Sequence, residues 1–231
     1  MPYLVALLTL AFAGSTLWVP DFGGFDPDHF PVPQDDPAVQ PAGYAFAIWG
    51  VIYLWLLVSA AFGVLRRPDA PDWQDMRGPL AISLAVGAIW LPAAVLSPVL
   101  ATSLIWAMLV PALIALIRSP VHDAGWASLP IGLYAGWLSA ASCVAIGLLL
   151  AGYGLLAEIP TAVIMIIAAT ALATFIQSRL NRAPTYGVAV IWAFVGIIVA
   201  APTLIAVIAA VASLIVAVPT VQAARGMTQR L

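Results

Sequence analysis

Charged side chains are scarce in this chain, and lysine is absent altogether. Charged residues make up 8% of the 231 residues, hydrophobic residues make up 64%, and the mean hydropathy is +1.07. Soluble domains carry about a quarter charged residues, so this composition excludes a soluble fold and predicts a polytopic integral membrane protein. A formal net charge of −2 without lysine also excludes the basic surface that nucleic-acid binding requires.

Residues that form disulfides or bind metals are equally few. The single cysteine, Cys143, lies in an apolar run, which excludes an intramolecular disulfide and a cysteine-based metal cluster. The two histidines, His29 and His122, fall in predicted loops, so we expect no dedicated transition-metal site.

Catalytic patterns are also missing from the apolar runs. None of these runs carries an ionisable residue near its middle, which weakens an ion-driven transporter. No histidine lies near a serine or cysteine within the predicted membrane segments, which weakens a hydrolase. The pair His122 and Asp123 could act as acid and base, but a solvated polar loop explains it better. We therefore predict no catalytic residues and no enzymatic activity.

Long apolar runs separated by polar or proline-containing segments predict an all-α membrane bundle of eight transmembrane helices. The run from 185 to 218 would rise about 51 Å as one helix, against a hydrocarbon core of about 30 Å. Ala201-Pro202 lies near its middle, so the run forms either two short spans or one kinked helix, and the charge pattern below favours two spans. The predicted spans are 1–19, 43–65, 78–96, 99–117, 128–151, 158–177, 185–200 and 202–222.

The first apolar run could also be a signal peptide, because Ala11-Phe12-Ala13 is similar to a cleavage site. The positive region that normally precedes such a site is missing, so we expect a retained span.

The arginines decide the expected orientation. With eight spans, all of them fall on the side of the two termini, which the positive-inside rule identifies as cytoplasmic. With seven spans, Arg225 and Arg230 would be misplaced. We expect a bacterial inner-membrane protein whose acidic, proline-rich 20–42 loop lies outside. That loop could bind a cation or a basic partner, although a solubilising connector is the simpler interpretation.

An aromatic motif follows this loop. On a helix Phe46, Trp49 and Tyr53 share one face, which by itself is typical of an interfacial aromatic belt. The whole stretch Pro41-Ala42-Gly43-Tyr44-Ala45-Phe46-Ala47-Ile48-Trp49-Gly50-Val51-Ile52-Tyr53 resembles the signature of the tryptophan-rich sensory protein (TspO/MBR) family, also called the translocator or peripheral benzodiazepine receptor family. Tyr44 stands where that family usually has tryptophan, and Ala42 where it often has a second proline.

Two further stretches carry the resemblance. Leu129-Pro130 followed by Tyr134 and Trp137 is similar to the family's fifth-helix pattern, with Ser142 in place of an asparagine. Trp90 is similar to the third-helix tryptophan, with Gly87 in place of an asparagine. The resemblance covers residues 1–155, a five-helix membrane bundle with the acidic loop 20–42, and leaves 156–231 as three additional transmembrane helices.

The resemblance implies a function. Family members hold tetrapyrroles and other flat apolar ligands between these helices, so it implies a membrane receptor or carrier and a bound porphyrin or other tetrapyrrole; no other cofactor is expected. The implied ligand-binding residues are Pro41, Gly43, Tyr44, Phe46, Trp49, Tyr53, Trp90, Tyr134, Trp137 and Ser142. His29 as an axial ligand to a metallated tetrapyrrole is a weaker expectation, and light-dependent degradation of a porphyrin ranks last.

Other interpretations stay open. The aromatic residues could simply fill gaps between helices. The spacing of Gly132, Gly136 and Ala140 gives a small-residue ridge that lets another helix approach closely, so the chain could instead be a structural or assembly subunit of a larger membrane complex. The family also implies a homodimer. Glu158 at a span boundary fits an interfacial carboxylate better than an ion-coupling group.

Overall fold

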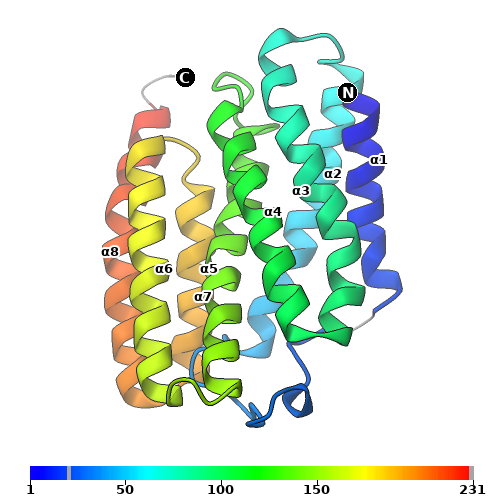
Figure 1. Cartoon of the computed structure of the whole chain (residues 1–231). Helices are drawn as coiled ribbons and strands as arrows, with labels where there is room; N and C mark the ends of the chain where they lie inside the picture. Colours follow the sequence, from blue (N-terminus) through cyan, green and yellow to red (C-terminus); the bar gives the residue numbers. More distant parts are fainter. Residues whose placement is uncertain (20–21, 229–231) are drawn as a thin grey trace.

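Eight α-helices run side by side in one bundle (Figure 1). The computed structural model describes residues 1–19 and 22–228, and this part of the chain contains no strand. The predicted all-α membrane bundle of eight helices is confirmed. The helices are α1 (Pro2–Gly14), α2 (Ile48–Leu65), α3 (Pro71–Leu96), α4 (Pro98–Arg118), α5 (Ser128–Gly152), α6 (Glu158–Leu180), α7 (Thr185–Ala200) and α8 (Thr203–Thr228).

The helices differ in length. Six of them, including α2 with the 3₁₀ turn η3 (Gly43–Ala47) before it, are long and apolar enough to cross a membrane. Helix α1 with the 3₁₀ turn η1 (Ser15–Leu17) and helix α7 are shorter apolar helices. Helix α7 has 16 residues and rises about 24 Å. It ends before Pro202, so the long C-terminal apolar run forms two helices.

The ends of the bundle differ in charge. The start of α1 and the end of α8 lie at one end, and the loop from 22 to 42 lies at the opposite end (Figure 1). Every arginine that the structure describes lies in the loops or helix ends on the side of the termini. Arg230 and Asp21, which the charge argument also used, lie outside the described residues.

The start of helix α3 differs from the boundary that the sequence predicted. The polar stretch 69–77 was expected as a loop before a span at 78–96, but the helix begins at Pro71. Proline is favoured in a first helical turn and Asp72 suits the positive helix start. Arg77 is only 2% exposed and donates hydrogen bonds to backbone carbonyls before α3, including that of Pro68 at 2.9 Å. These bonds compensate the burial of its charge.

Helix α5 is the centre of the bundle. It packs against α2, α4, α6 and α7, and most of its side chains are buried. Long apolar helices stay in contact where small residues let their backbones approach, and α5 is rich in glycine, alanine and serine. Its position lets it connect the aromatic residues of α2 with the C-terminal helices.

Candidate ligand-binding cavity

The connection into α2 is docked against α7. The backbone N–H of Ala42 donates to the carbonyl of Gly196 at 3.0 Å, and the indole N–H of Trp192 donates to the carbonyl of Ala45 at 2.9 Å. A Cβ on Gly196 would lie 2.8 Å from the Cβ of Pro41. Glycine is therefore required where the chain crosses α7, and this crossing fixes the direction of the aromatic face of α2.

That aromatic face meets the aromatic residues of α5. The rings of Trp49 and Tyr53 stack at 5.4 Å, and Trp49 meets Trp137 edge to face at 6.2 Å. Phe46 also meets Trp137 edge to face, at 5.8 Å. The structure thus brings together the second-helix and fifth-helix aromatics that the sequence singled out, although they are far apart along the chain.

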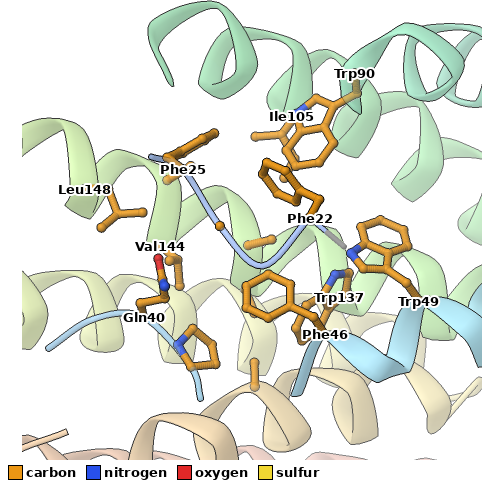
Figure 2. A pocket seen from close by; sticks show the side chains of 16 residues that line it. Phe22, Phe25, Gln40, Phe46, Trp49, Trp90, Ile105, Trp137, Val144 and Leu148 are labelled. Carbon is orange, nitrogen blue, oxygen red and sulfur yellow. The ribbon is translucent and has the colours of Figure 1, made fainter. Parts of the chain in front are cut away.

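A cavity of about 50 Å³ lies beside these rings, between the 22–42 loop and helices α2, α3, α4, α5 and α7. Figure 2 shows Trp49, Trp90, Trp137 and Phe46 around the ring of Phe22. Among the residues implied by the motif, those that line the cavity are Pro41, Phe46, Trp49, Trp90 and Trp137.

The other implied residues lie elsewhere. Tyr44 is 47% exposed and its ring meets Trp192, while Gly43 is in the turn before α2. The Tyr134 hydroxyl is buried and lies 2.8 Å from the Ser83 hydroxyl of α3. Tyr53 contacts Phe12 of α1 at 5.0 Å.

Ser142 is also outside the cavity lining. It is fully buried on α5, and no described residue forms a hydrogen bond with its hydroxyl.

Sequence reasoning missed the contribution of the 22–42 loop. Phe22, Gly24, Phe25 and Gln40 line the cavity, and Phe22 meets Trp90 edge to face at 5.4 Å. Gly24 has φ +136, and a Cβ there would lie 3.1 Å from the Gln40 side-chain amide. The available signal was three phenylalanines, Phe22, Phe25 and Phe30, within an acidic, proline-rich loop.

The later part of this loop is tied to the helix ends. The N–H of Val32 donates to the carbonyl of Gly152 at 2.8 Å, and the N–H of Ala38 donates to the Glu158 carboxylate at 2.8 Å. Glu158 therefore holds the loop against the start of α6.

The polar groups of the cavity are few and uncharged. The Trp90 indole N–H is satisfied by the carbonyl of Ala101 at 2.9 Å. Trp137 is only 2% exposed, and no described residue accepts a hydrogen bond from its indole N–H. A buried donor without an acceptor costs about 1–3 kcal/mol. A ligand carrying an acceptor atom could remove that cost.

The opposite end of the bundle holds an ion-pair cluster. Asp123 accepts hydrogen bonds from Arg67 at 2.8 and 3.1 Å and from the Trp73 indole at 2.8 Å. The Arg67 guanidinium holds the pKa of Asp123 below its usual range. His122 lies 3.1 Å from Asp72 and 3.6 Å from Asp123. Because Asp123 is held by two donors, its placement favours a tie between two loops over the acid–base pair.

No metal centre is formed by the described residues, since no three histidine, cysteine or acidic side chains lie close enough to hold an ion. His29 is exposed in the short turn η2 (Pro27–His29) and does not line the cavity.

The small-residue ridge of α5 is used within the chain. A Cβ on Gly132 would lie 2.6 Å from the Thr185 hydroxyl, and a Cβ on Gly136 would overlap the backbone carbonyl of Tyr186. Both glycines therefore face α7, whereas Ala140 lines the cavity. Because α7 covers the two glycines, this surface is not free for another membrane protein.

An all-helical bundle whose long helices are apolar enough to cross a membrane defines a polytopic integral membrane protein. The model of the TSPO-like protein family matches residues 33–222, and the chain belongs to that family. The resemblance seen in the sequence is thereby confirmed. Comparison with curated proteins and with solved structures gave no match.

The matched range has an informative position. It takes in α2 to α7 and most of α8, and it begins after α1 and after Phe22 and Phe25. Most walls of the cavity thus belong to the matched family region, while the rings that fill it precede that region. The division of the chain at residue 155 stays a prediction.

Proposed function

We propose that this protein is a membrane receptor or carrier that binds a flat apolar small molecule in the aromatic cavity. The observation that carries the proposal is the position of Trp137, whose buried indole N–H has no acceptor among the described residues while its ring forms part of the cavity wall. Aromatic walls with a few polar groups are typical of small-molecule sites. A tetrapyrrole is the ligand class that the family resemblance implies.

Binding of a ligand in this cavity requires the 22–42 loop to move. A cavity of about 50 Å³ is far below the 300 Å³ or more of common ligand pockets. The ring of Phe22 lies between the tryptophans where a planar ligand would stack (Figure 2). We infer that the ligand displaces Phe22 and Phe25, while the ties at Val32 and Ala38 keep the rest of the loop in place.

A titration with protoporphyrin, followed by quenching of tryptophan fluorescence, tests the proposal. Trp49→Phe, Trp137→Phe and the double variant should weaken saturable quenching, about tenfold or more for the double variant, because the stacking area is reduced and the indole N–H groups are lost. Trp126→Phe is the matched control, since Trp126 stacks on Phe62 at 4.8 Å beside the arginine end. Linear quenching that none of these variants changes would contradict a cavity site.

We also infer that the arginine end faces the cytoplasm, because positive residues are retained on that side of a membrane. The cavity and the acidic loop would then face outward. A reporter enzyme that is active only outside the cytoplasm should stay inactive when fused after Leu231. Activity of that fusion would reverse the orientation.

A further inference from the structure

The two ends of the bundle carry opposite charges, and the cavity lies near the acidic one. The end of the bundle that carries the 22–42 loop has the described acidic residues Asp26, Asp28, Asp35, Asp36 and Glu158. Every described arginine lies at the other end. Asp26 directly follows Phe25, which lines the cavity. A ligand approaching the cavity therefore meets a negative potential, which attracts cations and repels carboxylates.

The cavity itself offers no counter-ion for an anionic ligand. Among the described residues that line it, none is ionisable. The Trp90 N–H is already used, which leaves the Trp137 indole, the Trp49 indole and the Gln40 side-chain amide as neutral polar groups of the lining. Neutral donors can serve a carbonyl or ether oxygen, but without a counter-ion they do not offset the cost of moving a carboxylate out of water.

The aromatic walls favour the opposite charge. The rings of Trp49 and Trp137 meet at 83°, as do those of Phe46 and Trp137. Six aromatic side chains line the cavity, and three of them are tryptophans. The faces of aromatic rings are negative and attract cations, tryptophan most strongly. Both the interior and the surroundings of the cavity thus have the same preference.

We propose that the cavity selects planar aromatic molecules that carry a positive charge and discriminates against those that carry carboxylates. This inference rests on the proposed function and narrows it. The free N–H of Trp137 serves an acceptor atom of the same ligand. It follows that a tetrapyrrole with two free carboxylates binds less tightly than its uncharged diester.

Three probes with one ring system test the selectivity: pyrenylmethylammonium, pyrenylmethanol and pyrenecarboxylate. Each is titrated into the purified protein in a non-ionic detergent, and energy transfer from tryptophan to pyrene is measured. At low ionic strength the cation should bind about tenfold more tightly than the anion, with the neutral alcohol between them. High salt should reduce this ratio to about threefold, because exposed carboxylates are screened.

A pair of charge variants locates the source of the preference. Asp26→Asn with Asp28→Asn should lower the cation-to-anion ratio about threefold at low salt. Asparagine keeps the oxygen that caps the turn, where Asp26 accepts from the N–H of Asp28. Asp69→Asn with Asp75→Asn is the matched control at the arginine end and should leave the ratio unchanged.

The outcomes separate this inference from the proposed function. Equal binding of all three probes, or tighter binding of the carboxylate, would overturn the charge selectivity and leave the cavity as a binding site. Absence of saturable transfer with every probe would overturn both. A ratio that changes equally in both variant pairs would show that the acidic loop is not its source.

Discussion

The two sides of α5 differ in how closely they pack against their neighbours. Toward α7, Gly132 and Gly136 bring the two backbones into contact, and Ser139 lies 3.0 Å from the buried Tyr186 hydroxyl. Toward the 22–42 loop, Trp137 lies beside a cavity and its indole N–H has no acceptor among the described residues. In a membrane, packing and buried hydrogen bonds hold helices together, so the side that gives up both is the side where we propose that a ligand binds.

The largest expected difference between the two sides comes from adding methyl groups. Gly136→Ala places a Cβ against the backbone carbonyl of Tyr186, which cannot move as a side chain can. We expect a loss of several kcal/mol, within the range for strong overpacking, or failure to fold. Ala141→Val adds volume on the cavity side and should change the unfolding free energy by less than about 1 kcal/mol.

Denaturation in mixed micelles, followed by circular dichroism, measures both variants. Gly147→Ala on the same helix is a milder control, because the nearest atom to its Cβ would be a flexible Met165 side chain at 3.1 Å. If Gly136→Ala were as stable as Ala141→Val, the contrast between the two sides would be lost.

Removing a phenylalanine ring from each side gives the next largest difference. Phe194 of α7 is 1% exposed and belongs to the core, so Phe194→Ala should cost about 3–5 kcal/mol. Phe22→Ala removes a ring that only covers the cavity, and it should cost about 1 kcal/mol or less.

Ligand binding by the Phe22→Ala variant gives a second test of the comparison with Phe194→Ala. Phe22→Ala should bind the pyrene and porphyrin probes more tightly than the parent protein, since no ring must be displaced. Phe25→Ala should act in the same direction. Weaker binding by both variants would mean that these rings are part of the bound site and not a cover.

Much of the fold follows from local patterns, because proline, polar turns and apolar length act within a few residues. Pro202 divides the last apolar run as expected, and the motif leads directly to Trp49 and Trp137. The start of α3 was missed because a buried arginine looks like a loop residue until its partner carbonyls are known. Those carbonyls, of Gly63, Arg67 and Pro68, lie 9 to 14 residues before Arg77 and come within reach only when the turn between α2 and α3 has formed.

The cavity was harder to predict for the same reason. Phe22 and Phe25 reach it through a loop whose path is set by ties to Gly152, Glu158 and Gly196. Those ties join residues more than a hundred positions apart, and no local pattern encodes them. The family motif likewise identified Tyr44 as a ligand residue, yet its ring meets Trp192, a tryptophan of α7 outside the five helices that the motif addressed.

The smallest expected difference concerns two serines three residues apart. Ser139 donates to the carbonyl of Ala135 at 2.9 Å and contacts the Tyr186 hydroxyl, whereas Ser142 has no partner among the described residues. Ser139→Ala leaves the buried Tyr186 hydroxyl unsatisfied and should cost about 1–2 kcal/mol.

Ser142→Ala removes an unsatisfied hydroxyl and should be neutral or slightly stabilising, by up to about 1 kcal/mol. Both variants can be compared by the same denaturation, with Trp137-dependent quenching as a second readout. Because Ser142 does not line the cavity, its alanine variant should also bind the probes like the parent protein. A marked loss of binding in Ser142→Ala would show that the ligand reaches past Trp137 into the interior of the bundle, and the site would then extend deeper along α5 than the cavity does.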